Sequence, residues 1–373
     1  MLLLSGNNPF ICLESVIDPR VKRRKRHKLV DMLVIALCGF LAGCEGWVDV
    51  ELFGISKRKW LAKYLELPNG IPSHDTFGRV FALLDPHQLT RVLRQFVQAV
   101  VGSLEGEAVA IDGKTLACSG ERTTGQEALH LVSAWATQRG VVLGQVATAK
   151  HSNEITAIPA LLHSLDVRGT TVTIDAAGCQ KAIVRQIRAQ GADYVLAVKG
   201  NQKNLQEAVQ FQLGRGHSNL ERSKLKTREK NHGRKEQRTY TAMAAPFSVS
   251  HYWPDAQSIV RVCRETTYQG KKTVEVRDFI SSLPPQVDRL AALIRGHWGI
   301  ENRLHWSLDV TFNEDQSRIR QGHAAENAGL LRRLALSILK QDTQYTDSLR
   351  CKRLRAAWEN SALEHFLTIF TGN

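Results

Sequence analysis

Apolar residues recur at helical spacing through the first hundred residues. Between about residues 28 and 100 this pattern predicts several short helices, one of them over Pro72–Phe81 with Ser73 or Asp75 as its N-cap. Another amphipathic helix is expected to end near Val101. Short helices with cationic faces are typical of a helix-turn-helix DNA reader and equally of a plain helical bundle, so both interpretations stay open.

The pattern changes after Gly106, where short apolar runs bounded by turn residues predict strands. Three strands with antiparallel links are followed by helix, strand, helix and strand. This order predicts an α/β fold in which helices flank a mixed sheet. The expected strands are Val109–Asp112, Leu131–Ala136, Val141–Ala147, Thr170–Asp175 and Tyr194–Val198, and the expected helices are Glu154–Leu165 and Cys179–Gln190.

A segment of different character occupies about residues 215–285. It contains two strand-like runs, Ser258–Tyr268 and Thr273–Leu283, which meet at a Gln269–Gly270 turn, so we expect a small β-rich insertion. Helical pattern resumes at Val287 and continues to the end of the chain. The insertion begins with the basic residues Arg222, Lys224, Lys226, Arg228, Lys230, Arg234, Lys235 and Arg238.

The charge balance changes the picture from an ordinary globular protein to one that meets a polyanion. The 373 residues include 50 Lys and Arg against 36 Asp and Glu, a net charge of +14, while the hydrophobic fraction of 43% is normal for a folded chain. Neutralising phosphates releases condensed counterions, so a polyanion is the expected partner. A basic surface kept for solubility or for anionic lipid is the alternative.

Seven scattered cysteines without a CxxC pair argue against a disulfide scaffold and against a cysteine zinc site. One segment resembles the export signal of a lipoprotein. It consists of the basic residues 20–28, the apolar run Leu33–Ala42 and a possible cleavage site at Leu41–Cys44. However, the basic cluster lies too far into the chain and the apolar run is too short to span a bilayer. We therefore expect a cytoplasmic protein that associates with the nucleoid when bound to DNA and has no membrane partner.

Two aspartates each follow a short apolar strand, Asp112 after Val109–Ile111 and Asp175 after Thr170–Ile174. If these strands are parallel neighbours, the two carboxylates meet at the carboxyl edge of the sheet, where ligands collect. Two close carboxylates repel unless a cation lies between them, and Mg²⁺ prefers oxygen ligands. An Asp after a strand can instead only initiate a turn, and the residues alone leave both interpretations open.

A third carboxylate can come from the helix predicted over residues 294–310. His297, Glu301, His305 and Asp309 recur every four residues and should form one slowly drifting stripe. Such a stripe is usually a solvated helix face. A zinc site is also conceivable, but the pattern lacks the histidine pair with an intervening Glu that zinc proteases use.

Several long motifs in a fixed order resemble the H-repeat-associated proteins and related insertion-sequence transposases. The resemblance covers nearly the whole chain, and it includes the helical region around Pro72–Phe81. The strongest matching motif is His297–Val310. The other matching motifs are Ala110–Lys114, His151–Pro159, Thr173–Gln180, Gly191–Gln202 and His232–Arg234.

The resemblance implies a DDE transposase with a ribonuclease-H-like fold. Carried over by position, Asp112, Asp175 and Glu301 match the catalytic and metal-binding triad, which implies Mg²⁺ or Mn²⁺, with two ions expected. It further implies terminal inverted repeats and target DNA as partners, and we expect a homodimer or higher oligomer on DNA. Many hairpin-forming relatives carry Tyr, Arg and Lys where this chain has Ile294, His297 and Leu308, which puts the route of strand processing in doubt.

Three domains are expected: an N-terminal helical domain for DNA binding or assembly over residues 1–103, the catalytic domain with its insertion over 104–320, and a C-terminal helical region over 321–373. A catalytically inactive or domesticated DNA-binding remnant, and a metal-dependent nuclease that does not join DNA, are the competing functions. Lys199 and Asn201 follow the strand expected at the active edge, although Gly200–Asn201 can equally be a simple turn. The candidate DNA contacts are Lys199, Asn201, Arg234, His297, Asn302 and His305.

Overall fold

The computed structural model describes residues 11–21, 25–120, 125, 127–148, 153–214, 221–231 and 233–370. Residues 22–24 of the basic stretch, together with His151, Ser152 and His232 of the matching motifs, lie outside the described residues. The chain divides into two compact units. The first comprises residues 1–103, 113–151 and 301–373, and the second comprises 104–112 and 152–300.

In the first unit, helices surround the long helix α13 (Ala324–Gln341), which is buried over most of its length and contacts α2, α5, α6 and β3. Trp47 stacks against Phe77 and Phe81 and fixes α3 to α5. The unit also contains the hairpin of β2 and β3. Its elements are α1 (Ile11–Glu14), α2 (Leu29–Leu41), α3 (Trp47–Ser56), α4 (Arg58–Leu61), α5 (His74–Leu83), α6 (Pro86–Val101), β2 (His130–Ala136), β3 (Val141–Ala147), α12 (Trp306–Val310), α13, α14 (Leu349–Trp358) and α15 (Asn360–Ile369).

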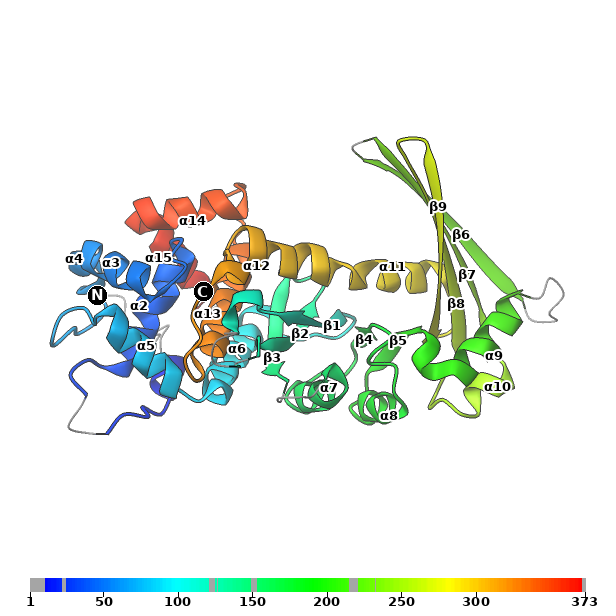
Figure 1. Ribbon diagram of the computed structural model, residues 1–373, viewed down its shortest axis with the longest axis horizontal. Helices are drawn as coiled ribbons and strands as arrows, with labels where there is room; N and C mark the ends of the chain where they lie inside the picture. Colours follow the sequence, from blue (N-terminus) through cyan, green and yellow to red (C-terminus); the bar gives the residue numbers. More distant parts are fainter. Residues whose placement is uncertain are drawn as a thin grey trace. The chain divides into compact units, whose positions relative to one another are not determined.

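In the second unit, the strands β1, β4 and β5 run parallel, and β5 pairs antiparallel with β9. Helices α7 and α8 lie on one side of these strands and α11 lies on the other (Figure 1). The elements are β1 (Ala108–Thr115), α7 (Glu154–His163), β4 (Thr171–Ile174), α8 (Lys181–Ala189), β5 (Asp193–Val198), α9 (Lys203–Gly214), β6 (Arg222–Asn231), β7 (Arg234–Ala244), α10 (Phe247–Ser250), β8 (Ser258–Tyr268), β9 (Lys271–Ser281) and α11 (Val287–His297).

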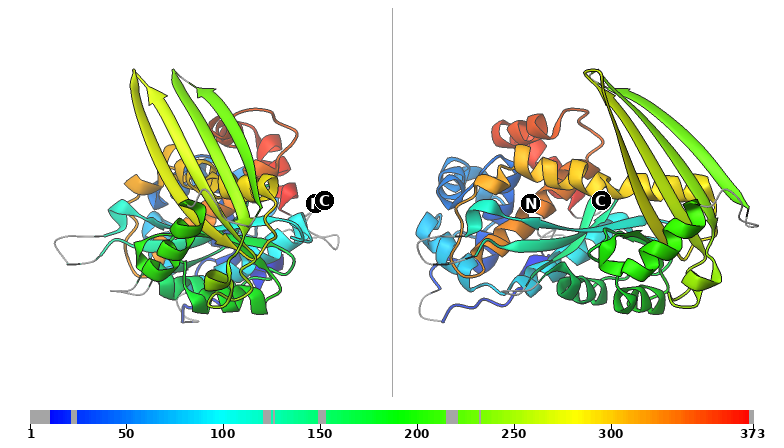
Figure 2. Two further views of the ribbon diagram at one scale, coloured as in Figure 1. Left: turned by 90° about the vertical axis from the view of Figure 1, so that its right-hand side faces the viewer. Right: turned by 45° about the vertical axis from the view of Figure 1, so that its right-hand side comes forward.

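Within the described residues, the strands form a nine-stranded sheet in the order β3-β2-β1-β4-β5-β9-β8-β7-β6. This order, with helices on both faces, confirms the predicted mixed α/β fold. The insertion lies within the expected range, but its basic first part, where no strand was predicted, forms β6 and β7 beside the expected β8 and β9, and all four are antiparallel strands of ten or eleven residues. They form an extended arm (Figure 2). Among the described residues, no helix is both long and apolar enough to cross a membrane.

Candidate active site

Asp112 and Asp175 occupy matching places in neighbouring parallel strands, each just after the last paired residues. Asp175 directly follows β4, whereas β1 continues to Thr115, so the prediction that its strand ends at Asp112 is wrong. In the register of β1 and β4, Ile111 pairs with Ile174, and each aspartate is the next residue along its strand direction. Both side chains are half-buried, and the strand residues before them are buried. The expectation that these two strands are neighbours is therefore confirmed. Two carboxylates so placed form an oxygen-donor pair of the kind that hard divalent cations prefer.

The turn after Asp175 is held by backbone hydrogen bonds to its own carboxylate. Asp175 Oδ1 accepts hydrogen bonds from the backbone N–H of Ala177 at 2.9 Å and of Gly178 at 3.4 Å. A side chain at Gly178 would collide with Ile174, because a Cβ there would lie 2.3 Å from Ile174 Cγ2. Asn201 supports the same turn by donating from Nδ2 to the carbonyl of Ala176 at 2.7 Å. The amide expected to contact DNA thus has a structural partner.

His297, the last residue of α11, is attached to the strand that leads to Asp175. Its Nδ1 and the hydroxyl of Thr173 lie 3.0 Å apart and share a hydrogen bond. Burial lowers the pKa of His297 to about 4, against the opposing influence of Asp175. The imidazole is consequently neutral at physiological pH, so it can offer DNA phosphate a hydrogen bond but no positive charge.

Glu301 is exposed on a π-helical segment, Ile300–His305, between α11 and α12. The prediction that His297, Glu301, His305 and Asp309 form one stripe on a regular helix is wrong. In a π-helix the hydrogen bonds join residue i to residue i+5, whereas in an α-helix they join i to i+4. The residues after such a segment are therefore turned about the helix axis, away from the positions that a continuous α-helix would give them. As a result Glu301 faces solvent, whereas His305 and Asp309 are half-buried.

The other candidate DNA contacts lie in different surroundings. Lys199 is exposed after β5, which pairs in parallel with β4, and Asn302 is exposed beside Glu301. Arg234, at the start of β7, forms an ion pair with Glu236 at 3.2 Å. Burial lowers the pKa of His305 to about 3, with Arg333 and Lys114 acting in the same direction. His305 is therefore a neutral, inward-lying side chain.

The sequence reasoning missed a buried ion cluster centred on Lys114, two residues after Asp112 in β1. Its Nζ lies 2.7 Å from Asp309 Oδ1, 2.5 Å from Asp315 Oδ1 and 3.9 Å from Glu314 Oε2. Glu314 in turn pairs with the fully buried Arg333 at 2.8 Å. Lys114 belongs to a matching motif, but its partners lie about two hundred residues away, so nothing in the local pattern pointed to them.

Within the described residues, no three His, Cys, Asp or Glu side chains converge as a metal cluster. The donor chemistry at this position of the sheet nevertheless suits Mg²⁺ or Mn²⁺, because Asp112 and Asp175 supply oxygen alone. Cys179, the nearest thiol in sequence, is buried, and burial raises its pKa to about 12. It therefore stays a thiol and does not compete as a ligand.

Comparison with known proteins identifies the family. The family described as Transposase DDE domain matches residues 103–339, and the one described as DDE_Tnp_1-associated matches residues 10–97. YhhI of Escherichia coli, an H repeat-associated protein that carries a transposase name, is 37% identical over 359 residues, covering 94% of this chain and 95% of YhhI. YncI of Escherichia coli, also named as a transposase, is 38% identical over 357 residues, covering 94% and 92%.

Among solved structures, a piggyBac transposase synaptic complex with hairpin DNA aligns with 99% of this chain and 80% of that chain, at a TM-score of 0.44 and 11% identity. The DDE domain profile spans more than half of the chain, and the two curated relatives match it almost from end to end. On the evidence of that profile and those relatives, this chain belongs to the family of DDE transposases.

Proposed function

We propose that this transposase cuts DNA at the ends of its element and joins the exposed ends to target DNA, with Asp112, Asp175 and Glu301 binding the divalent metal ions that the reaction requires. The observation that carries the proposal is the register of β1 and β4, in which Asp112 and Asp175 follow the paired residues Ile111 and Ile174. In α/β sheets, ligands bind outside the carboxyl ends of the parallel strands.

Each carboxylate has a distinct part in holding the ions. The backbone N–H groups of Ala177 and Gly178 donate hydrogen bonds to Asp175 Oδ1 and so fix the orientation of this carboxylate. Glu301 adds an exposed carboxylate four residues after His297, whose bond to Thr173 attaches the end of α11 to β4. Bound Mg²⁺ or Mn²⁺, two ions in such sites, would activate the attacking oxygen and stabilise the leaving one.

The proposed chemistry comprises two displacements at phosphorus. In the first, a water oxygen forms a bond to phosphorus at the element end, the P–O3′ bond breaks, and the 3′ oxygen leaves as a hydroxyl. In the second, that hydroxyl gives up its proton as its oxygen attacks a target phosphodiester, whose own P–O3′ bond breaks. One phosphodiester replaces another in the second step, so joining needs no external energy source.

The partners of this reaction are double-stranded DNA with the element's terminal inverted repeats, and target DNA. Because two ends must be joined together, we infer that a homodimer or higher oligomer assembles on the DNA. Lys199, exposed after β5, and Asn302, exposed next to Glu301, remain candidate contacts. His297 would contribute a neutral hydrogen bond.

The test uses linear DNA that carries the inverted repeats flanking the gene, incubated with the purified protein and Mg²⁺ or Mn²⁺. Nicked, excised and joined products are expected together. Cleavage without joined products would contradict the strand-transfer step and indicate a nuclease. Specific binding without any cleavage would contradict both steps and indicate an inactive DNA-binding remnant.

A further inference from the structure

The edge strand β6 carries a row of cations on one face. Lys224, Lys226, Arg228 and Lys230 alternate with other residues, and alternate residues of a strand point to the same side of the sheet. All four side chains are exposed. Since β6 is the last strand in the sheet order, this row lies along an open edge of the arm. We refer to these four residues as the β6 row.

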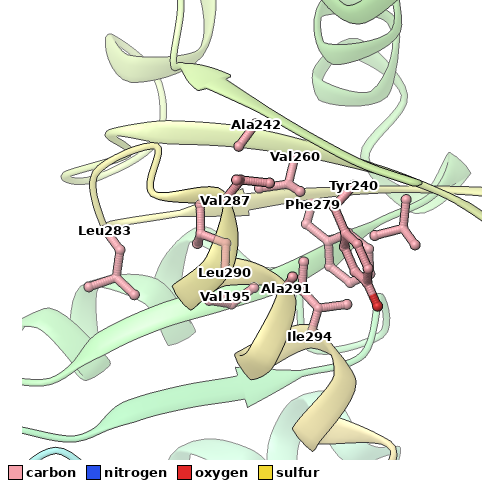
Figure 3. Close-up of a cluster of buried hydrophobic side chains, with 11 residues drawn as sticks. Val195, Tyr240, Ala242, Val260, Phe279, Leu283, Val287, Leu290, Ala291 and Ile294 are labelled. Carbon is pink, nitrogen blue, oxygen red and sulfur yellow. The ribbon is translucent and has the colours of Figure 1, made fainter. Parts of the chain in front are cut away.

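The opposite face of the arm is covered by α11. Val287, Leu290, Ala291 and Ile294 of this helix pack against Tyr240, Val260 and Phe279 of the strands (Figure 3). Leu225, between two residues of the β6 row, packs against the same cluster. The two faces of β6 are therefore assigned unambiguously: one is part of the core under α11, and the other carries the row.

Cations on the covered face are paired with acids. Arg238 pairs with Glu236 and, at 3.2 Å, with Glu229, and Arg295 also binds Glu229, at 2.9 Å. Glu275 lies 3.2 Å from Arg264 and 2.6 Å from Arg277. The arginines on this side are thus compensated within the protein.

The β6 row lacks such compensation. In the part of the chain that the structure describes, no acidic side chain forms an ion pair with Lys224, Lys226 or Lys230, and Arg228 donates from Nε to the neutral Gln237 at 2.9 Å. Lys230 is moreover directly opposite Lys235 of β7, which is also exposed. Like charges directly opposite each other destabilise a strand pair unless an anion lies between them.

These observations point to an extended, regularly charged anion. Alternate residues of a strand are about 6.7 Å apart, so the four cations span about 20 Å, a length over which a nucleic acid backbone presents several phosphates. Lysines on an edge strand can instead serve only to prevent pairing with another chain. That simpler role requires neither four cations on a single face nor Lys230 opposite Lys235.

We propose that the β6 row, with Lys235, binds the phosphate backbone of the double-stranded DNA on which the transposase acts. The inference rests on the proposed function and assigns to the insertion a specific surface for that substrate. Lysine and arginine contacts of this kind fix the orientation of the duplex without reading its sequence. The arm therefore contributes affinity that is strongly dependent on salt and independent of the terminal repeat sequence.

The decisive experiment measures DNA affinity at several salt concentrations for the full-length protein and for the quadruple variant Lys224→Gln/Lys226→Gln/Arg228→Gln/Lys230→Gln. Each lost phosphate contact should reduce the log–log salt slope by about 0.9. We expect the slope to fall by about three to four and affinity at low salt to fall at least tenfold. The double variant Lys224→Gln/Lys226→Gln, remote from the hairpin turn, should lose about half as much slope.

A charge-matched control removes four exposed cations that lie outside β6 to β9, Arg168→Gln/Lys203→Gln/Arg289→Gln/Arg350→Gln. It should keep nearly the full slope. Without DNA, Lys230→Gln should be at least as stable to urea as the wild type, because one of two opposed charges is gone. Equal slopes for the quadruple variant and the wild type would overturn the inference and leave the row as edge protection. Absence of DNA binding by the wild type would instead overturn the proposed function itself.

Discussion

Lys114 Nζ and Asp309 Oδ1 form an ion pair at 2.7 Å, joining the end of β1 to α12. The lysine lies two residues after Asp112, and Asp309 lies eight residues after Glu301. The helical pattern of the sequence placed Asp309 in one stripe with Glu301, but this ion pair gives Asp309 a structural role. Glu314 belongs to the same cluster, because its carboxylate lies near Lys114 and pairs with Arg333.

Replacing Lys114 by Met should destabilise the protein. It would leave the carboxylates of Asp309, Asp315 and Glu314 without their shared cation, and removing one partner of a buried ion pair costs about 3–5 kcal/mol. Asp309 and Asp315 are about one-third exposed, so a loss of about 2–4 kcal/mol is expected from urea unfolding after allowing for solvent screening. The exposed Lys199→Met is the control and should change stability by at most about 0.5 kcal/mol. Equal stability of the two variants would contradict the cluster.

Gly178→Ala should disturb the turn that fixes Asp175. The added methyl would lie 2.3 Å from Ile174 Cγ2 and 3.1 Å from Ile158 Cδ1, so the turn or the strand must shift. Overpacking of this kind costs about 1–3 kcal/mol, and DNA cleavage should fall more than DNA binding. Gly214→Ala is the matched control, because no atom lies within 4 Å of a Cβ at that position. Unchanged stability and cleavage in Gly178→Ala would show that the turn tolerates a side chain.

His305 should make the stability of the protein depend on pH in the acidic range. Its pKa falls from 6.5 to about 3 on folding because the imidazole is buried, so the unfolded chain binds the proton more readily. Stability is therefore unaffected above about pH 6.5 and decreases as the pH falls below it, by at most about 1.4 kcal/mol per pH unit. The measurement is the free energy of urea unfolding of the wild type and of His305→Gln between about pH 7 and about pH 4. This free energy should depend less on pH in the variant than in the wild type. Parallel profiles would contradict the assignment.

Much of the fold could be predicted because its strands are marked by short β-branched or apolar runs. Thr171–Ile174 and Val141–Ala147 are examples, and both are strands. Asp175 also follows its strand as expected, whereas Asp112 lies inside β1, which continues to Thr115. That the two aspartates are in register could not be deduced locally, since pairing of β1 with β4 joins segments about sixty residues apart.

Other features depended on information that a local pattern does not contain. The sequence of Ile300–His305 is that of an ordinary helix, so its π-helical conformation was not predictable. For the same reason, the different surroundings of Glu301 and Asp309 could not be predicted. Trp306, in the helix that follows this segment, is 57% exposed. The alternation of lysines in β6 was visible, but only the pairing with β7 and the cover by α11 show which face is free.

The most direct test of the central claim compares Asp112→Asn, Asp175→Asn and Glu301→Gln with the wild type on DNA carrying the element ends. The control is Asp166→Asn, an exposed aspartate between α7 and β4. In the presence of Mg²⁺ or Mn²⁺, each of the three variants should lose cleavage and joining almost completely while binding the DNA with nearly wild-type affinity, and the control should retain all activities. Because the three carboxylates act as one unit, a double variant should be hardly worse than a single one. Cleavage at the wild-type rate by any of the three would contradict the account.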